Sequence, residues 1–304
     1  MNSYLALPFS GQASKVFARQ VKGLDTRLKK MNCRSVVIGL SGGLDSTLAL
    51  LVSYETFKKN GWDLKGIHVY TMPGFGTTKR TKGNAEFLAE GLGLEIKTID
   101  ITKACKQHFK DIGYDPAVYH VVYENAQARE RTQILFDIAN LVGGIVIGTG
   151  DMSEIALGWC TFNGDHMANF GVNSGVPKTV VREVCAYWAK KNPGKAADAI
   201  NDIILTPISP ELVPGQVTED KIGPYELHDH FMMEYCGFKK SHAATLASAK
   251  KAFKGKYDDK TIEKWYSIFK TRLVSQAFKR NCAPDGIKIF ELYFGPYDWH
   301  LPSV

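Results

Sequence analysis

From Val36 to Leu50 the chain reads VVIGLSGGLDSTLAL. The β-branched beginning of this segment is typical of a buried strand, and the apolar run from Leu48 is typical of the first turns of a helix. Between the two runs, glycines and small hydroxyl residues leave backbone N–H groups unobstructed, and the positive end of a helix dipole favours negative charge. The segment therefore predicts a strand–loop–helix unit whose loop binds phosphate.

Asp45 distinguishes this loop from the usual phosphate loop, which places a lysine before its serine or threonine. A carboxylate beside phosphates is repulsive unless a cation lies between them, so Asp45 predicts a magnesium ion. The run SGGLDS over residues 41–46 resembles the pyrophosphate loop of the N-type ATP pyrophosphatases, enzymes that split ATP into AMP and pyrophosphate. The alternative is an ordinary glycine turn before a helix, which the full match in this context disfavours.

Composition limits the classes of protein to which the chain can belong. Of its 304 residues, 44% are hydrophobic and 23% are charged, which is typical of one large or two smaller globular domains. No apolar run approaches the roughly 18 residues needed to span a bilayer, and residues 1–15 lack the pattern of a secretory signal. The six scattered cysteines favour free thiols in a reducing compartment, and a net charge of +7 is too modest to indicate long nucleic acid. We therefore expect a cytoplasmic protein with neither a membrane nor a nucleic-acid partner.

Further strand-plus-helix units follow the first one. Strands are predicted over 64–70, 94–101 and 145–148, and helices over 11–31, 84–91, 102–113, 123–140 and 179–189. Four such units in succession predict an α/β fold with a Rossmann-like, doubly wound parallel sheet flanked by helices. From Lys191 onward, prolines and irregular loops replace this pattern. We therefore expect one domain over 1–304, with its core sheet at about 15–190 and a helical, loop-rich extension at about 191–304.

Several other polar motifs have both a functional and a purely structural interpretation. Residues 151–154 resemble a helix start, and on residue type alone Glu154 is more readily a capping residue than a ligand-binding one. The charge cluster at 123–131 is usually a solvated helix face, and the polar loop at 72–81 could be a plain connection with a threonine cap. The run His228-Asp229-His230 is set aside as a metal site, because residues two apart on a helix point to different faces.

Taken in order, these motifs resemble the synthetase domain of glutamine-dependent NAD⁺ synthetase. The resemblance extends from about residue 15 to residue 302 and rests on the stretches 39–46, 72–78, 123–129, 148–159, 176–179, 206–212, 276–280 and 284–286. It implies that the nicotinate carboxylate of deamido-NAD⁺ attacks the α-phosphate of ATP, and that ammonia then displaces AMP to form the amide of NAD⁺. Adenylation converts a poor leaving group into a good one, so the protein mainly positions substrates and neutralises charge.

The resemblance also implies roles for individual residues. The catalytic residues would be Asp45, Glu154 and Lys178, with Mg²⁺ held by Asp45 and Glu154. The co-substrate ATP would be bound by Gly39, Leu40, Ser41, Gly42, Gly43, Asp45, Ser46, Thr47, Thr149 and Lys178. Deamido-NAD⁺ would contact Asn125, Arg129, Glu154, Trp159, Cys160, Thr161, Phe162, Asp165 and Lys279. The residues themselves leave open that Arg129 and Lys178 are merely surface charges, whereas the Trp159 indole suits stacking on a ring.

Two departures from the family pattern affect the expected partners. The family's long form carries a nitrilase-like glutaminase domain, for which these 304 residues have no room. Ammonia would therefore be free, supplied by a separate glutaminase, or provided by a longer parent protein. The segment 295–303 also lacks the basic residues that the family usually has there. By resemblance, we expect a homo-oligomer, a dimer or larger, with only small-molecule substrates.

Two other functions remain open from the residues. One is another adenylating enzyme with the same loop, such as one that modifies tRNA; that class commonly adds sulfur-handling cysteines or a basic RNA-binding face, and neither is visible. The other is a catalytically degenerate nucleotide-binding subunit, which would have no need to keep Asp45, Glu154 and Lys178. A dinucleotide oxidoreductase is disfavoured, because the Gly-x-Gly-x-x-Gly fingerprint does not follow the first strand.

Overall fold

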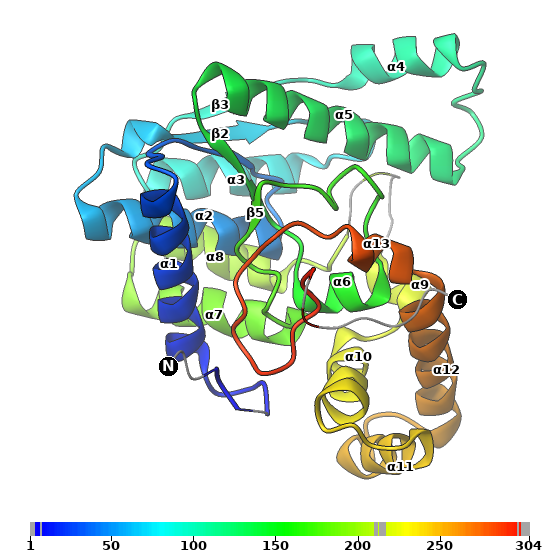
Figure 1. Ribbon diagram of the computed structural model, residues 1–304. Coiled ribbons are helices and arrows are strands. Elements are labelled where there is room, and N and C mark those ends of the chain that lie inside the picture. The colour runs from blue at the N-terminus through cyan, green and yellow to red at the C-terminus, as the bar shows by residue number, and fades with distance from the viewer. Residues whose placement is uncertain (1–3, 7, 210–211, 213–216, 297, 299–304) are drawn as a thin grey trace.

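A five-stranded parallel sheet forms the centre of the molecule, with the strand order β3-β2-β1-β4-β5 (Figure 1). The computed structural model describes residues 4–6, 8–209, 212, 217–296 and 298. The strands are β1 (Val36–Gly39), β2 (Ile67–Thr71), β3 (Ile96–Thr98), β4 (Ile145–Gly148) and β5 (Phe170–Gly171). Each neighbouring pair is parallel, and β1 pairs with β2 on one side and with β4 on the other. The prediction of a doubly wound parallel α/β sheet is confirmed.

Helices cover both faces of this sheet (Figure 1). One side carries α1 (Ala13–Lys30), α2 (Leu44–Asn60), α7 (Lys178–Lys191) and α8 (Lys195–Leu205), with α3 (Lys79–Gly91) packed against α8. The other side carries α5 (Val121–Leu141), which contacts β1 and β4, and α4 (Thr102–Asp111), which packs on α5. Val36 and Ile38 point toward the first group of helices, whereas Val37 between them packs with residues of α5. This alternation explains why β1 is apolar throughout its length.

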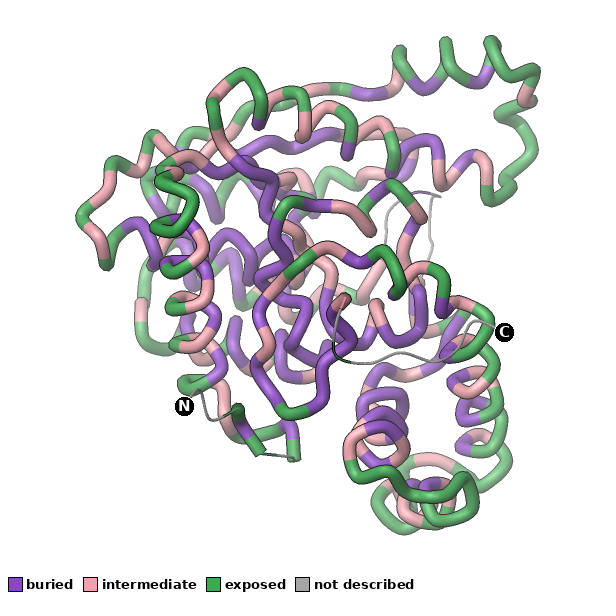
Figure 2. The backbone as a smooth tube through the Cα atoms, viewed as in Figure 1, coloured by how far each residue is buried: buried purple, intermediate pink, exposed green. Residues whose placement is uncertain are grey.

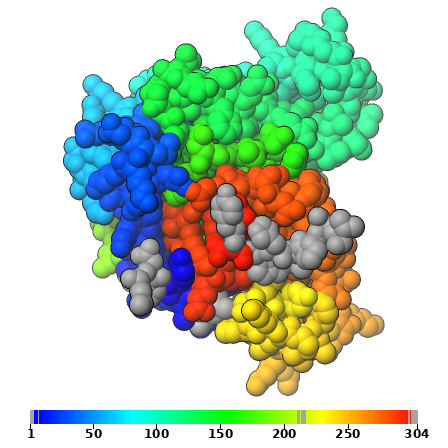
Figure 3. Space-filling view, in the orientation of Figure 1, coloured from blue at the N-terminus to red at the C-terminus, as the bar shows by residue number. Residues whose placement is uncertain are grey.

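The C-terminal part of the chain is helical and lies against the short helix α6 (Met152–Leu157). It consists of α9 (Thr218–Ile222), α10 (Tyr225–Phe231), a π-helical turn over Met232–Gly237, α11 (His242–Ala252), α12 (Asp259–Ser275) and α13 (Ala277–Asn281). Phe231, Tyr266 and Phe269 form an aromatic cluster between α10 and α12. In Figure 3 the residues after α12 lie between the layer of α5 above and α10 and α11 below. The expected division of the chain near residue 190 stays a prediction.

The observed elements differ from the predicted ones in four places. Helix α3 begins at Lys79 rather than at residue 84, because the Thr78 side chain accepts a hydrogen bond from the Thr81 N–H and caps the helix there. Strand β3 is only three residues long, and the 3₁₀ turn η1 (Leu64–Gly66) occupies the predicted beginning of β2. Strand β5 lies between the predicted strand at 145–148 and the predicted helix at 179–189, where no strand was predicted. It has two residues, too few for a period-2 pattern.

Burial follows the layers of the fold (Figure 2). Strands β1, β2, β4 and β5 and the helix faces that touch them are largely buried, whereas the edge strand β3, α4 and the connection from α4 to α5 are largely exposed. Among the described residues, no helix combines the length and the apolar character that crossing a membrane requires. Most of the segment 295–303 lies outside the described residues.

Candidate active site

A cavity of about 640 Å³ opens at the carboxyl ends of β1 and β4. The strand order reverses between these two strands, and ligands of doubly wound sheets bind at such a switch point. The cavity is lined by the loop after β1, the ends of β2 and β4, the inner side of α5, the segment Trp159–Phe162 and parts of α12 and α13. Segments far apart in the sequence therefore meet around one space.

The loop between β1 and α2 folds on its own hydroxyl groups. The Gly43 N–H donates to Ser41 Oγ at 3.2 Å, the Ser41 N–H donates to Ser46 Oγ at 3.2 Å, and the two serine Oγ atoms lie 3.0 Å apart. Gly42 has φ +84°, and a Cβ there would lie 2.1 Å from the Thr81 carbonyl oxygen. Only glycine permits this approach of the loop to α3. Thr47 is fully buried behind the loop and does not line the cavity.

One lysine and three carboxylates form an ionic cluster beside this loop. Lys178 Nζ lies 2.6 Å from Asp45 Oδ2, 2.7 Å from Asp151 Oδ2 and 2.8 Å from Glu154 Oε1. The Lys178 side chain is only 2% exposed, which excludes the interpretation as a surface charge. Asp45 stands in the first turn of α2, Lys178 begins α7, and the other two carboxylates begin α6. Three helix N-termini thus bring four charges together.

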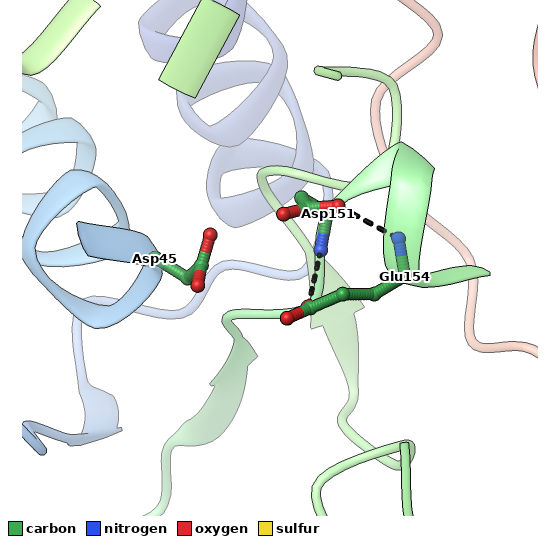
Figure 4. A group of neighbouring side chains, drawn as sticks. All are labelled: Asp45, Asp151 and Glu154. Carbon is green, nitrogen blue, oxygen red and sulfur yellow. Dashed lines mark hydrogen bonds between the residues drawn. The ribbon is translucent and has the colours of Figure 1, made fainter. Parts of the chain in front are cut away.

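Asp151 and Glu154 also cap α6, as Figure 4 shows. Asp151 Oδ1 accepts from the Glu154 N–H at 2.8 Å, and Glu154 Oε2 accepts from the Asp151 N–H at 3.2 Å. This is the capping box that residue type alone predicted for Glu154. Its other oxygen, Oε1, bonds to Lys178. Glu154 therefore both caps a helix and faces the cavity, and the two interpretations are compatible.

Burial and crowding perturb the charges of this cluster. Burial raises the pKa of Glu154 to about 7, with Lys178 opposing and Asp45 adding to the rise. Burial also raises the pKa of Asp151 well above its usual value. Although burial alone lowers the pKa of Lys178, its three carboxylate neighbours hold that pKa well above the usual value. The ammonium stays charged, but one positive charge does not balance three carboxylates.

The three carboxylates fit a divalent cation. One oxygen from each lies within 4.8 Å of the others, and Asp45 Oδ1 is buried without a hydrogen-bond partner in the described structure. Hard carboxylate oxygens are the ligands that Mg²⁺ prefers. By contrast, the residues His228, Asp229 and His230 face different neighbours, namely Ile222, Ser153 and Ser248. The three side chains thus have different partners, as expected of neighbouring residues that point to different faces of a helix.

The segment after α6 lies on the other side of the cavity. The Thr161 N–H donates to Asp165 Oδ1 at 2.8 Å, and Thr161 Oγ1 donates to Asn125 Oδ1 on α5 at 2.8 Å. The Phe162 ring lies between the rings of His166 and Phe278, each 5.5 Å away. These contacts fix a wall with an aromatic part and a polar part, which suits a ring-bearing polar ligand.

Most of the residues proposed from the sequence meet in this cavity. Its lining includes Gly39, Leu40, Ser41, Gly42, Gly43, Asp45, Ser46, Asn125, Thr149, Glu154, Trp159, Cys160, Thr161, Phe162, Asp165 and Lys279. Lys178 does not line the cavity itself, but its Nζ contacts the lining residues Asp45 and Glu154. Arg129 is exposed outside the lining, where its Nε donates to the Phe162 carbonyl at 3.1 Å.

The sequence analysis missed two residues that hold the site together. Asp151 was treated only as part of a helix start, yet it is fully buried against Lys178. Asn173 is fully buried, and its side-chain N–H donates to the carbonyls of Asp45 at 2.9 Å and Thr149 at 3.0 Å. The capping-box spacing could have pointed to Asp151, because it already paired that carboxylate with Glu154. No local pattern distinguishes Asn173 from the polar residues around it.

Comparisons with known proteins agree with this geometry. A protein-family model described as NAD synthase matches residues 16–280. A glutamine-dependent NAD⁺ synthetase from Mycobacterium tuberculosis is 37% identical, over 93% of this chain and 46% of its own length. The corresponding protein from Thermotoga maritima is 32% identical, over 97% of this chain and 48% of its own length. A crystal structure of a glutamine-dependent NAD⁺ synthetase from Cytophaga hutchinsonii superposes with a TM-score of 0.81 at 18% identity, covering 97% of this chain and 54% of that one. The chain thus spans about half the length of these relatives.

Proposed function

Because the chain belongs to the NAD synthase family, we propose that it converts deamido-NAD⁺ to NAD⁺. The reaction consumes ATP, passes through an adenylated nicotinate carboxylate, and releases AMP and pyrophosphate, with ammonia as the nitrogen donor. The enzyme is then a ligase that forms a C–N bond. The observation that carries the proposal is the cluster of Asp45, Asp151, Glu154 and Lys178 between a glycine-rich loop and an aromatic wall. On this proposal, these charged groups lie beside the phosphoryl centre and the attacking carboxylate.

The loop after β1 is the proposed site for the phosphates of ATP. The hydroxyls of Ser41 and Ser46 and the N–H groups at the start of α2 would hold the departing pyrophosphate, and the dipole of this 17-residue helix adds positive potential. Thr149 lies at the end of β4 on the same cavity wall. Lys178 would contribute a cation directly to phosphate only after exchanging at least one of its carboxylate partners.

Asp45 and Glu154 are the residues that would hold Mg²⁺, with Asp151 beside them. When bound there, the ion offsets negative charge on the departing pyrophosphate. Asp151 is fully buried and already bonded to Lys178 and to α6, so its proposed role is to keep Lys178 in place. The protein's part in the reaction is alignment: it holds the attacking carboxylate and the α-phosphate together and keeps the reacting groups out of bulk water.

The wall formed by Trp159–Phe162 is the proposed site for deamido-NAD⁺. Trp159 offers an indole face, while Thr161 and Asn125 are already paired with each other and present a fixed polar edge. Asp165 lines the cavity as an exposed residue, and its Oδ1 already accepts from the Thr161 N–H. Lys279 donates to two backbone carbonyls, so its contact with a substrate would be shared with the wall itself. Arg129 would act through the Phe162 carbonyl rather than by direct contact.

The proposal extends to the source of the ammonia, the assembly of the protein and its location in the cell. The proposed nitrogen donor is ammonia, either free or supplied by a separate glutaminase. We expect small-molecule substrates and a homo-oligomer. The six cysteines are free thiols, which supports a cytoplasmic location.

The test is NAD⁺ formation by the purified chain with deamido-NAD⁺, ATP and MgCl₂, comparing ammonium chloride with glutamine. We expect NAD⁺ with ammonium, accompanied by one AMP for each NAD⁺. Asp137→Ala, a charge loss at an exposed position of α5, should leave this activity unchanged. ATP cleavage without NAD⁺ would overturn the proposed substrate, and absence of both products would favour a degenerate subunit. The family match weighs against a tRNA-modifying enzyme, the other alternative.

A further inference from the structure

The carbonyl end of α6 has its hydrogen bonds supplied by basic side chains. The last four carbonyls of any helix lack partners within the helix. Here the Trp159 N–H donates to the Glu154 carbonyl at 2.9 Å, and the Gly158 N–H donates to the Ile155 carbonyl at 3.2 Å. The following carbonyls, at positions 156–158, are left to other donors. Because these lie beside the cavity wall, what binds them bears directly on the site.

Three cations from α12 and α13 provide those donors. Arg280 Nη1 donates to the Ala156 carbonyl at 2.8 Å, and Arg272 Nε donates to the Leu157 carbonyl at 3.0 Å. Lys279 Nζ donates to the carbonyls of Gly158 at 2.8 Å and Cys160 at 2.7 Å. Positive charge at this end of a helix also complements its dipole. We call Arg272, Lys279 and Arg280 the basic clamp.

Gly158 allows the basic clamp to come this close. Its φ is +57°, and a Cβ there would lie 2.3 Å from the Cβ of Gln276, the residue between α12 and α13. Any other side chain would push α6 and the clamp apart. The backbone turn after α6 and the helices that hold it are therefore fitted to each other.

Arg280 differs from the other two members in its surroundings. It is 4% exposed, does not line the cavity, and also donates to the Leu273 carbonyl, so it joins the end of α12 to the end of α6. Burial lowers its pKa to about 10, so the guanidinium stays charged at neutral pH. A buried charge is costly unless its hydrogen bonds are made, and two backbone carbonyls make them here.

We infer that Arg280 is a positioning residue, which fixes the carbonyl end of α6 and thereby the place of residues 158–161 on the cavity wall. It contacts no part of the cavity itself. Its effect on turnover rests on the proposed function, because the wall is the proposed site for deamido-NAD⁺. Its effect on the backbone does not.

The test compares Arg280→Met and Arg280→Lys with Lys260→Met, which removes a charge at an exposed position near the start of α12. Amide hydrogen exchange without substrates should speed up about tenfold or more in peptides covering residues 156–162 of Arg280→Met, and less in Arg280→Lys. The Lys260→Met chain should match the wild type. In the ammonia-dependent assay, KM for deamido-NAD⁺ should rise about ten- to hundredfold, the range of one charge-assisted hydrogen bond, with KM for ATP within about twofold.

Two results would overturn the inference. One is exchange that stays at the wild-type rate in residues 156–162; the other is exchange that rises equally throughout the chain, as expected of a residue that only stabilises the fold. If Arg280→Met does not fold, Arg280→Lys decides by the same exchange comparison. A wild-type chain without turnover would contradict the proposed function alone, because the exchange measurement needs no substrate.

Discussion

The two ends of α6 carry opposite charges, and they are compensated in different ways. At the N-terminal end, Asp151 and Glu154 share the single ammonium of Lys178 with Asp45. At the C-terminal end, the three cations of the basic clamp are bonded to backbone carbonyls. Both arrangements complement the helix dipole. At the acidic end, however, three carboxyl groups share one ammonium, whereas the donors of the basic end are all occupied by carbonyls.

This difference separates a reactive end from a structural one. Carboxyl groups that outnumber their cationic partners beside a cavity can bind a further cation, including one that arrives with a ligand. Donors that are already bonded to carbonyls are less available to a ligand, and they hold the backbone in place. Changes at the acidic end should therefore alter activity and cation dependence most strongly, and changes at the basic end should alter substrate affinity.

The largest effect is expected for Lys178→Met. Removal of the ammonium leaves three carboxylates within 4.8 Å of one another, one of them fully buried and two half-buried. Breaking a buried ion pair by removal of one partner typically costs about 3–5 kcal/mol of unfolding free energy. We expect a loss of this order in urea unfolding, together with loss of NAD⁺ formation. Lys190→Met, at an exposed position near the other end of α7, is the matched control and should cost little.

Magnesium makes this comparison sharper. If the carboxylates bind Mg²⁺, added MgCl₂ should stabilise Lys178→Met more than the wild type, because the ion no longer competes with the ammonium. A variant as stable as the wild type, with or without the ion, would show that Lys178 is not what holds the acidic end together.

Asp45→Asn should lower activity strongly at a small cost in stability. The substitution keeps the size of the side chain but removes one charge that faces the cavity. Lys178 retains Asp151 and Glu154 as partners, so the fold should survive. We expect a fall of about 10³-fold in kcat, typical of the loss of one group that stabilises transition-state charge. A kcat within tenfold of the wild type would remove Asp45 from the proposed metal ligands.

The same comparison shows what the sequence could predict and what it could not. The phosphate-binding loop was predictable because its strand, glycines and helix are contiguous, and Glu154 was predictable as a capping residue because the capping box is local. The burial of Lys178 was not, because its three partners belong to α2 and α6, far from it in the sequence. The basic clamp depends on contacts across more than a hundred residues and on the positive φ of Gly158.

Asp229→Ala should have a moderate effect, on the acidic end. Asp229 on α10 accepts from Ser153 Oγ, from the Thr179 N–H at 2.9 Å and from Thr179 Oγ1 at 2.7 Å. It thus ties α10 to the first turns of α6 and α7. We expect a loss of about 2 kcal/mol in unfolding free energy, comparable to the removal of a good helix cap. Asp229→Asn retains one acceptor oxygen and should lose less; equal losses would mean that these bonds contribute little.

The last prediction concerns the pH dependence of the helices that pack behind the basic clamp. His228 belongs to α10, and its Nε2–H donates to the Ile222 carbonyl at 2.6 Å while its ring faces Phe269 of α12. Burial lowers its pKa from 6.5 to about 4. The folded protein therefore binds fewer protons than the unfolded chain between these values, and stability should fall as the pH drops from 6.5 toward 4, by up to about 1.4 kcal/mol per pH unit. His228→Gln, which keeps an N–H donor, should flatten this slope in urea titrations at pH 5 and 6, whereas His108→Gln on exposed α4 should not. If the unfolding free energy of His228→Gln changed with pH as steeply as that of the wild type, His228 would take up its proton in the folded state. The helices α10 and α12 would then open readily, and they would hold the basic clamp less rigidly than the helices behind the acidic end hold theirs.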